Sequence, residues 1–591
     1  MSFQAILHLT TVIAVIALSS SSIVKSPSND GTFELLILHN NDMHARFEQT
    51  SQLSGACTTA DRDAGKCYGG FPRVAHIVKE ARKAAESGEG PPVLYLNAGD
   101  TYTGTAWFTI YKWTIAAEFL NALQPDAVSL GNHEFDQGVN GLTPFIKNLK
   151  SPVLAANLIL TKVPELEKEV NLRNSIVFNI SGTPIGVIGY LTPETKHLVL
   201  PNDVEYIEET IALQREVNNL KEDGVKIIIA LGHSGYLKDL EIAKKVDGLS
   251  LVIGGHTNTF LWNGTSPDSE KIIGPYPTYV TQTSGKQVPV VQAYAYTKYL
   301  GKLHMVFNSK GELLRADGNP ILLDNSIPQD PEVLNIINQY KEKVLNYTEE
   351  VIGNTSVVLD GLSCQHTECN LGNLIADAMV YTYAMDYNGE HWTDAPIAVI
   401  QGGGIRSSIS VTKIPTTITK GDLIAVLPFE GILVVVKMTG TILKQMLEHA
   451  IANLSDLDPP GEFLQVSGLK VMYNLDKPIG SKVINVMARC WNCSIPLYSD
   501  VTENEEYNVI MPNFIFNGGD GYSMFTGLPV RSLTYGEFDA TSLYIKQHSP
   551  VWPEIEGRVI LRQNSATDSS YVLRPSIMYI AIVITATLHI L

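Results

Sequence analysis

The sequence predicts an α/β protein of two domains joined by a helix. From residue 34 to about residue 325, short runs of β-branched or leucine residues alternate with polar loops and amphipathic helical stretches. A charged helical stretch follows at residues 331–350, and strand-like and helical segments resume over residues 353–562. At roughly 150 residues per domain the 591-residue chain has room for about four domains, but two large α/β domains fit the pattern equally well.

The composition disfavours two classes of partner. The chain carries 43 basic and 61 acidic residues, which gives a net charge of −18 at pH 7. Binding to nucleic acid, or to an anionic lipid surface through charge, needs clustered Lys and Arg. Hydrophobic residues make up 45% of the chain and charged residues 18%, a balance typical of folded proteins with large buried cores.

Five continuous apolar runs in the first half predict strands that are buried on both faces. They lie at residues 35–38, 93–96, 127–130, 227–230 and 251–253. In the second half, residues 370–383 predict a helix, and residues 397–400 and 434–436 predict strands. Between the halves, Asp330 is the expected N-cap of the connecting helix and Gly353 lies just past its end.

Each of the five runs is followed by side chains that can bind a metal ion. The loops at the carboxyl ends of neighbouring strands in an open α/β sheet face one crevice, so residues far apart in sequence can meet there. A single Asp or His after a strand is most often a cap or a loop hydrogen-bonding residue. Five strand ends with the same chemistry instead indicate a metal centre. These residues are Asp42, His44, Asp100, Asn132, His133, Glu134, His233 and His256.

The six cysteines fall into three close pairs, Cys57/Cys67, Cys364/Cys369 and Cys490/Cys493. Six cysteines allow 15 connectivities, and pairing nearest neighbours costs the least loop-closure entropy. We therefore expect three short-loop disulfides and an oxidising compartment. A zinc ribbon is the alternative for the last pair, but the chain has no second CxxC motif to complete four ligands. The six N-x-S/T sequons are compatible with secretion.

The two ends of the chain have the composition of targeting signals. Residues 1–22 predict a signal peptide, with an apolar stretch at residues 6–18 followed by serines, although no Lys or Arg precedes that stretch. A disordered apolar leader is the alternative. Residues 563–591 predict a GPI-attachment signal, with small residues at 565–567, a polar spacer and an apolar tail at 577–591 that is short for a transmembrane helix. A buried strand or helix is the alternative for that tail.

The motifs of the first half resemble those of the dimetal calcineurin-like metallophosphoesterases. The potential metal ligands that follow the five predicted strands match that signature in type and order. Longer strings from both halves resemble the ecto-5′-nucleotidase family more narrowly, and its members include secreted nucleotidases and apyrases of blood-feeding arthropods. These strings are Gly131-Asn-His-Glu-Phe-Asp136, Asn370-Leu-Gly-Asn373, Gly402-Gly-Gly-Ile-Arg406 and Asn517-Gly-Gly-Asp-Gly521.

The resemblance covers about residues 33–562 and implies a domain plan. A dimetal metallophosphoesterase domain, an αββα sandwich, would occupy residues 31–328. A connecting helix would follow at residues 329–352, and a second α/β domain that binds the nucleotide would occupy residues 353–562. The glycine run before Arg406 is not followed by Lys and Ser or Thr, so it is not a P-loop.

The resemblance also implies a site for two divalent metal ions. Oxygen and imidazole ligands without thiolate suit Zn²⁺, with Mn²⁺ as the alternative. Two such ions can activate water and neutralise the oxygens of an in-line displacement on phosphorus. The implied ligands are Asp42, His44 and Asp100 for one ion and Asp100, Asn132, His233 and His256 for the other.

The remaining site residues follow from the same resemblance. His133 and Asp136 would form a catalytic dyad whose imidazolium stabilises charge on the phosphoryl oxygens or the leaving group. Two phenylalanine rings would stack on the base, an arginine would bind the substrate and an aspartate would accept hydrogen bonds from the ribose hydroxyls. Without the motif, each phenylalanine would be assigned to a core. The nucleotide-binding residues are Arg406, Phe429, Phe514 and Asp520.

Two residues depart from the family pattern. Gln365 stands where vertebrate ecto-5′-nucleotidases have Arg, and Gln401 stands where the family usually has Asn. Loss of the guanidinium leaves Arg406 as the main expected cation for the substrate phosphate. We therefore expect weaker binding or an altered preference among mono-, di- and triphosphates, with the hydrolytic chemistry retained.

The sequence thus predicts an extracellular 5′-nucleotidase that releases phosphate from nucleoside 5′-monophosphates, chiefly AMP. An apyrase acting on ATP and ADP is the alternative on the same scaffold, and a 2′,3′-cyclic phosphodiesterase or an inactive nucleotide-binding protein fits less well. The expected partners are the nucleotide and, through a lipid anchor, the membrane, with no nucleic acid. Homodimer formation, base preference and the metal used in the cell are left open.

Overall fold

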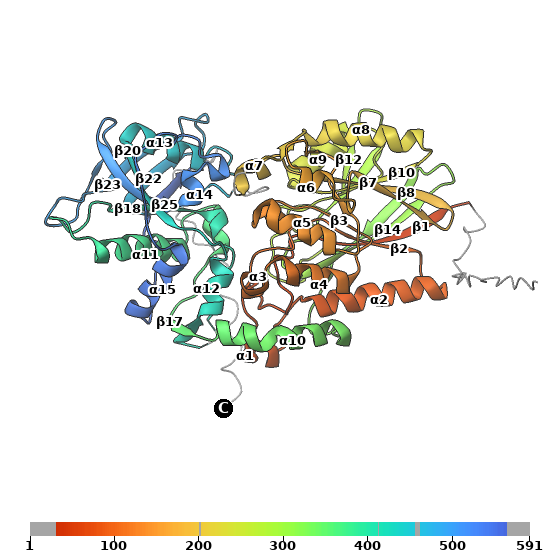
Figure 1. Cartoon of the computed structure of the whole chain (residues 1–591), viewed down its shortest axis with the longest axis horizontal. Helices are drawn as coiled ribbons and strands as arrows, with labels where there is room; N and C mark the ends of the chain where they lie inside the picture. The colour runs from red at the N-terminus through yellow and green to blue at the C-terminus, as the bar shows by residue number, and fades with distance from the viewer. Residues whose placement is uncertain (1–30, 200–201, 412, 456–460, 564–591) are drawn as a thin grey trace, which may run out of the picture.

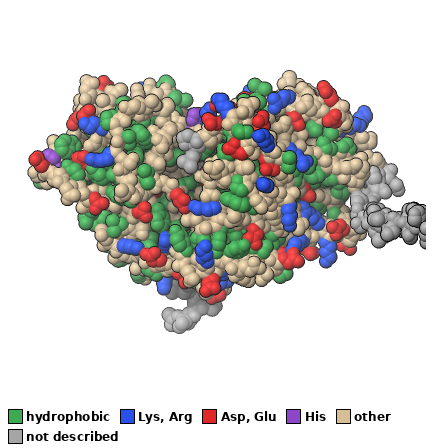
Figure 2. Space-filling view, viewed as in Figure 1, with side chains coloured by type: hydrophobic (Ala, Val, Ile, Leu, Met, Phe, Trp, Pro, Cys, Tyr) green, Lys and Arg blue, Asp and Glu red, His purple; other side chains and the backbone are tan. Residues whose placement is uncertain are grey.

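The computed structural model describes residues 31–199, 202–411, 413–455 and 461–563. The predicted signal peptide, and the predicted anchor signal except for residue 563, lie outside the described residues. Within the described part, the chain forms two α/β halves that lie side by side along its long axis (Figure 1), and the surface dips where they meet (Figure 2). The predicted two-domain α/β fold is therefore confirmed.

The first sheet of the N-terminal domain has eight strands, in the order β15-β14-β1-β2-β3-β4-β6, with β16 paired to β14. Strands β1, β2, β3, β4 and β6 are parallel, and β14 and β15 complete the sheet in antiparallel pairing. The strands are β1 (Phe33–Asn40), β2 (Val93–Asn97), β3 (Ala127–Ser129), β4 (Val153–Leu154), β6 (Leu172–Arg173), β14 (Tyr299–Phe307), β15 (Leu313–Gly318) and β16 (Ile321–Leu322).

The second sheet has six strands, in the order β12-β13-β11-β10-β8-β7, with a parallel centre from β8 to β13. All five predicted runs are strands, but they divide between the sheets: β1, β2 and β3 belong to the first sheet, and β10 and β11 to the second. The strands are β7 (Ser175–Ile180), β8 (Thr183–Leu191), β10 (Ile227–His233), β11 (Leu251–Ile253), β12 (Thr278–Thr281) and β13 (Gln287–Val291); β5 (Leu158–Ile159) and β9 (Glu205–Tyr206) pair separately.

Strand β1 shows why these runs are apolar at every position. Leu35 and Ile37 belong to the core between the two sheets, whereas Leu36 and Leu38 belong to the core between the first sheet and its helices. Burial of each such side chain contributes about 1.5–3 kcal/mol to folding. The layers are therefore helix, sheet, sheet, helix (Figure 1). The covering helices are α2 (Phe71–Ser87), α4 (Trp113–Leu123) and α5 (Gly138–Asn148) on the first sheet and α8 (Glu209–Glu222) and α9 (Tyr236–Lys245) on the second.

Helix α10 (Pro331–Thr348) joins the two halves. It begins after Asp330, whose side chain accepts hydrogen bonds from two backbone amides of the first turn, as the sequence predicts. Its buried apolar side chains pack in the core of the N-terminal domain, together with Ile424 of α12 (Lys420–Val426) from the C-terminal domain. The connecting helix therefore contacts both domains.

The C-terminal domain is built on a five-stranded mixed sheet, in the order β21-β18-β25-β20-β26, and a four-stranded sheet, in the order β24-β23-β22-β27. Helices α11 (Asn370–Asp386), α12 and α15 (Glu537–His548) cover one face of the larger sheet, and α13 (Gly440–Ala450) packs on the other. The strands are β18 (Ile397–Gln401), β20 (Leu433–Thr439), β21 (Leu464–Ser467), β22 (Leu469–Asn474), β23 (Val483–Arg489), β24 (Tyr498–Asp500), β25 (Glu506–Pro512), β26 (Val530–Ser532) and β27 (Val559–Arg562), with β17 (Val351–Thr355) and β19 (Thr416–Thr419) as a separate pair.

Short helical turns lie in the loops of both domains. In the N-terminal domain these are α1 (Thr59–Asp63), α3 (Ala106–Tyr111), η1 (His133–Phe135), α6 (Pro164–Glu167) and α7 (Thr195–Leu198). In the C-terminal domain they are η2 (Leu362–Gln365), η3 (Gly402–Gly404), α14 (Asn513–Phe516) and η4 (Gly519–Gly521).

The three predicted cysteine pairs are all disulfide-bonded. This result excludes the zinc ribbon at Cys490 and Cys493, because a thiol in a disulfide cannot bind zinc as thiolate. Among the helices of the described ranges, none combines the length and the apolar composition needed to cross a bilayer.

Candidate metal centre and nucleotide site

The six predicted metal ligands meet at the carboxyl ends of strands from both sheets. Asp42 and His44 follow β1, Asp100 follows β2 and Asn132 follows β3, all in the first sheet. His233 is the last residue of β10, and His256 follows β11, both in the second sheet. The site therefore lies where the two sheets adjoin, and its halves come from different sheets.

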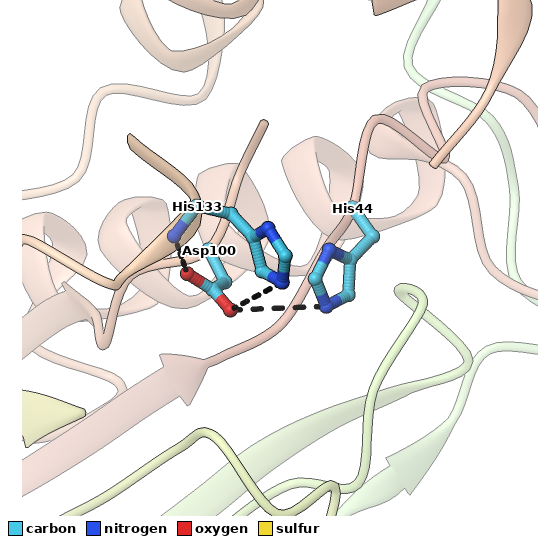
Figure 3. A group of neighbouring side chains, drawn as sticks. All are labelled: His44, Asp100 and His133. Atoms are coloured by element: carbon cyan, nitrogen blue, oxygen red, sulfur yellow. Dashed lines mark hydrogen bonds and ion pairs between the residues drawn. The ribbon is translucent and has the colours of Figure 1, made fainter. Parts of the chain in front are cut away.

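Asp100 lies at the centre of the cluster. Its Oδ2 atom is 3.9 Å from Nε2 of His44 and 4.0 Å from Nε2 of His133, and its Oδ1 accepts a hydrogen bond from the backbone amide of His133 (Figure 3). The same Oδ2 atom is 2.9 Å from Nε2 of His233. Two groups of side chains share this carboxylate, His44 with His133 and His233 with His256, and the ligand atoms within each group lie within 4.8 Å of one another. One carboxylate thus faces two clusters of nitrogen ligands.

The other carboxylate and the amide complete the same cluster. Oδ1 of Asp42 is 3.8 Å from Nε2 of His44 and 3.6 Å from Nε2 of His233. The Oδ1 atom of Asn132 is 3.0 Å from Nδ1 of His256. All six predicted ligands therefore belong to one continuous set of contacts.

Two of the imidazole rings are oriented by backbone carbonyl groups. Nδ1 of His44 donates to the carbonyl of Thr103 at 3.1 Å, and Nδ1 of His233 donates to the carbonyl of Ala98 at 2.7 Å. With the proton on Nδ1, the Nε2 atom faces the carboxylates and is available to bind a metal ion. Burial, and then the charge of Arg406, hold the pKa of His44 well below its ordinary value, so this ring is neutral.

Four of the ligands have backbone conformations that are costly for a residue with a side chain. Their φ values are 49° at Asp42, 46° at His44, 56° at Asp100 and 82° at His256. Such conformations cost about 1–3 kcal/mol each and occur mainly at functional sites, where surrounding contacts hold them. At Asp42 those contacts include hydrogen bonds to Oδ2 from the Asn41 side chain (2.8 Å) and from the His256 amide (2.9 Å).

Glu134 positions the loop that carries Asp100. Its buried carboxylate accepts hydrogen bonds from the backbone amides of Gly131 (2.7 Å), Asp100 (2.9 Å) and Thr101 (2.7 Å). Burial, and then the charge of Asp100, raise its pKa to about 7. The sequence marks Glu134 only as one more potential ligand, so its structural role emerges from the fold. A Cβ atom at Gly131 would lie 2.1 Å from Oδ1 of Asp100, so the loop needs glycine there.

The chemistry of this cluster fits divalent cations. Burial alone would lower the pKa of His233, but the carboxylates of Asp100 and Asp42 raise it to about 10, so these two carboxylates favour positive charge between them. The Oδ1 atom of Asn258 is buried and, within the described ranges, has no hydrogen-bond partner, which leaves it as a further oxygen donor. Buried oxygen and imidazole ligands with no thiolate are the donor set of Zn²⁺ and Mn²⁺ sites.

His133 and Asp136 form a close pair beside the cluster. Nδ1 of His133 lies 2.9 Å from Oδ2 and 3.1 Å from Oδ1 of Asp136, and Thr103 donates a further hydrogen bond to the same carboxylate. Burial opposes charge on the ring, but Asp136 and Asp100 outweigh it and raise the pKa of His133. The two carboxylates therefore favour the protonated form of the imidazole next to the metal-binding cluster.

Two of the four predicted nucleotide-binding residues reach this cluster from the C-terminal domain. Nη2 of Arg406 lies 2.8 Å from Nε2 of His44. The ring of Phe429 stacks on His133, with centroids 5.6 Å apart and planes at 21°. The domain boundary therefore runs through the site, and side chains from both domains face each other there.

The other two residues lie on short turns of the C-terminal domain. Phe514 belongs to α14, and its ring packs so closely on Gly519 that a Cβ atom there would lie 2.5 Å from it. Asp520, in η4, is half-buried and has φ 50°. Burial, and then the carboxylates of Glu462 and Glu194, raise the pKa of Asp520 to about 7.

The two departures from the family pattern lie beside the glycine run. Gln401 ends β18, and its buried Oε1 atom has no hydrogen-bond partner in the described part of the chain. Gln365 ends η2, which packs against η3: a Cβ atom at Gly402 would lie 2.9 Å from Cα of Gln365. Both residues therefore contact the loop that leads to Arg406.

Comparison with known proteins places the two halves in known families. Residues 35–260 match the calcineurin-like phosphoesterases, and residues 351–527 match the 5′-nucleotidase C-terminal domain. The chain is 47% identical to Protein 5NUC of Lutzomyia longipalpis over 90% of its own length and 93% of that protein. It is 42% identical to the 5′-nucleotidase of Homo sapiens over 92% of this chain and 93% of that protein.

A solved structure agrees with these similarities. The crystal structure of a 5′-nucleotidase precursor from Thermus thermophilus is 31% identical, with a TM-score of 0.81, and the match covers 90% of this chain and 99% of that one. Sequence and fold therefore agree over nearly the whole described chain. The chain belongs to the 5′-nucleotidase family, in which a calcineurin-like phosphoesterase domain precedes a 5′-nucleotidase C-terminal domain.

Proposed function

We propose that this protein is a metal-dependent 5′-nucleotidase that hydrolyses nucleoside 5′-monophosphates, chiefly AMP, to a nucleoside and phosphate. One observation carries the proposal: Arg406 and Phe429 of the nucleotide-binding domain lie directly against His44 and His133 of the metal-binding cluster. A nucleotide bound by the first pair would present its phosphate to the cluster. The names and the coverage of the relatives support the same activity.

Two divalent metal ions complete this site in the proposal, with Zn²⁺ preferred and Mn²⁺ as the alternative. When bound, the ions would activate water and neutralise charge on the phosphoryl oxygens. Asp100 would bridge them, because its Oδ2 faces both groups of imidazoles. The proposed ligands are Asp42, His44 and Asp100 for one ion and Asp100, Asn132, His233 and His256 for the other.

The protein's own side chains act on the substrate in three ways. Asp136 keeps His133 protonated, so that the imidazolium stabilises the charge that develops as the phosphate ester breaks. Arg406 binds the phosphate through charge-assisted hydrogen bonds. Phe429 and Phe514 stack on the base, and Asp520 accepts hydrogen bonds from the ribose hydroxyls.

The location of the enzyme is part of the same proposal. Three disulfides favour an oxidising compartment. We infer that residues 1–22 direct secretion and that residues 563–591 are replaced by a GPI anchor at the cell surface. A phosphatidylinositol-specific phospholipase should then release the enzyme from cells, and the released chain should lack residues 577–591. Detection of Leu591 in the mature protein would contradict the anchor.

We propose the domain plan that the resemblance implies, and the two family matches support it. The first match, residues 35–260, lies inside the proposed metal-binding domain at 31–328. The second match, residues 351–527, lies inside the proposed nucleotide-binding domain at 353–562 except for residues 351 and 352. Those two residues fall in the proposed connecting segment at 329–352. Homodimer formation is best measured directly, by light scattering on the purified enzyme.

Phosphate release from AMP, ADP and ATP by the purified protein tests the proposed activity. We expect hydrolysis of AMP to be fastest, to stop on treatment with a chelator and to return when Zn²⁺ or Mn²⁺ is added. Faster hydrolysis of ADP and ATP would replace the proposal with an apyrase. Nucleotide binding without phosphate release from any of the three would indicate an inactive nucleotide-binding protein.

A further inference from the structure

Tyr296 contacts both the metal-binding cluster and the backbone that carries Arg406. Its ring lies over the guanidinium of Arg46, with Cζ 4.5 Å from the ring centroid, and beside the ring of His44, with centroids 5.7 Å apart. Its hydroxyl donates a hydrogen bond to the backbone carbonyl of Arg406 at 3.3 Å. One side chain of the N-terminal domain therefore contacts both His44 and the backbone of Arg406.

Arg46 holds the ring of Tyr296 in place. This arginine is 1% exposed, and its Nη1 donates to the carbonyl of His44 at 2.9 Å. Its Nε and Nη2 atoms have no hydrogen-bond partner within the described residues, and burial lowers its pKa to about 10. The face of an aromatic ring carries partial negative charge and attracts such a cation. The ring of Tyr296 thus stabilises the guanidinium of Arg46 in place of hydrogen-bond acceptors. This contact fixes the orientation of the ring and so the position of its hydroxyl.

The backbone around Tyr296 is also held in a costly conformation. The φ values are 59° at Tyr294, 58° at Tyr296 and 62° at Thr297, all in the left-handed region. The amide of Tyr296 donates to the carbonyl of Asp42 at 2.8 Å, and the Asn41 side chain donates to the carbonyl of Tyr294 at 2.6 Å. Strain of this kind persists where contacts hold it and is concentrated at functional sites. This segment is held by the same loop that supplies Asp42.

Arg406 is consequently linked to that loop through its main chain and its side chain. Its amide donates to the carbonyl of Val426 in its own domain, its carbonyl accepts from Tyr296, and its guanidinium lies 2.8 Å from His44. We propose that Tyr296 is a positioning residue, which sets the place of Arg406 relative to the metal centre and thereby the affinity for the 5′-phosphate. This inference rests on the proposed function.

The substitution Tyr296→Phe tests the hydroxyl alone, because it keeps the ring over Arg46. We expect the KM for AMP, and the Kd of a non-hydrolysable phosphonate analogue of AMP, to rise about three- to tenfold, as for the loss of one hydrogen bond. The kcat value should change less than twofold, and the metal content should not change. Tyr279→Phe is the matched control, since the Tyr279 hydroxyl also donates to a backbone carbonyl, that of Ala316, within the N-terminal domain.

The same substitution in an Arg406→Ala background separates positioning from ordinary packing. If Tyr296 acts through Arg406, Tyr296→Phe should have no further effect on the Kd of the analogue once the guanidinium is absent. An unchanged Kd in the single variant, or an equal rise in both backgrounds, overturns the proposal. Because analogue binding is measured without turnover, a wild-type protein that binds the analogue but hydrolyses no nucleotide would count against the proposed function alone.

Discussion

Five of the six predicted metal ligands are at most 3% exposed, whereas the four predicted nucleotide-binding side chains are all half-buried. The exception among the ligands is His256, which is partly exposed. The ligands lie at the ends of core strands and are fixed by backbone carbonyls and amides of their own domain. The nucleotide-binding residues lie on short turns and loops, and two of them find their closest partners in the other domain.

This difference in burial indicates that the two domains have different roles in the reaction. Ligands that are buried and held by several hydrogen bonds keep one geometry, which suits metal-assisted chemistry at a fixed centre. Half-buried side chains on loops can be changed at smaller cost to the fold. Changes in the metal-binding domain should therefore abolish hydrolysis, and changes in the nucleotide-binding domain should alter affinity and preference.

The largest expected effect is that of Asp100→Ala, which removes the carboxylate shared by both groups of imidazoles. We expect no measurable hydrolysis with the fold retained, because among the described residues Asp100 is the one member common to both ligand groups. Phosphate release measures hydrolysis, and circular dichroism shows whether the fold is retained. Activity above a few per cent of wild type in a variant that still contains both metals would contradict the central role of Asp100. Asp317→Ala, at an exposed ion pair, is the control.

His133→Ala should have the next largest effect. The ring acts on charge that develops during the reaction, so kcat should fall by about 10²–10⁴ while the metal content is unchanged. Single-turnover kinetics measure the rate of the chemical step, and elemental analysis measures the metal content, in the variant and in the wild type. If kcat were unchanged, His133 would be a structural loop residue. Loss of metal together with activity would instead make His133 a ligand, consistent with its place in one of the two ligand groups.

In the nucleotide-binding domain, Gln365→Arg should act mainly on affinity. A guanidinium beside the Gly402 loop would add a charge-assisted hydrogen bond of roughly 1.5–3 kcal/mol, which corresponds to a ten- to hundredfold lower KM for the preferred nucleotide. The kcat value should change much less. Steady-state kinetics with AMP, ADP and ATP measure both. If KM and the preference among the three stay the same, position 365 does not reach the substrate.

The smallest expected effect is a pH dependence that arises at Asp520. Its pKa, raised to about 7, means that the carboxylate is increasingly ionised as the pH rises from 6 to 8. Because the ionised form is the better acceptor for the ribose hydroxyls, affinity should increase over this range, by a factor of a few. Adenosine is the probe, since it lacks a phosphate that titrates nearby. Asp520→Asn should remove the dependence, and a flat profile in the wild type would contradict it.

The sequence predicts the buried core of the metal-binding domain better than it predicts the half-buried loops of the nucleotide-binding domain. The runs around Leu35, Val93 and Ile227 are recognisable as strands because burial on both faces demands an apolar residue at every position. Periodicity does not reveal which sheet a strand joins, so the division of β1–β3 from β10 and β11 becomes visible only in the fold. The nearest-neighbour disulfides were predictable because short loops are cheap to close.

Contacts between distant segments were the part that sequence reasoning missed. Glu134 follows the predicted ligand Asn132 by two residues, yet its carboxylate accepts hydrogen bonds from backbone amides of the loop after β2. The contact of Tyr296 with Arg406 joins residues 110 positions apart in different domains. No local pattern encodes either contact, because each depends on how the loops are placed by the assembled sheets.

Hydrolysis is expected to depend on two metal ions held by one buried cluster, and a metal titration tests this dependence most directly. Metal-stripped protein is titrated with Zn²⁺, and phosphate release from AMP is measured at each ratio of metal to chain. We predict negligible activity at first and a plateau at two equivalents per chain. Full activity in the stripped protein, or a plateau at one equivalent, would contradict a site that needs two metal ions.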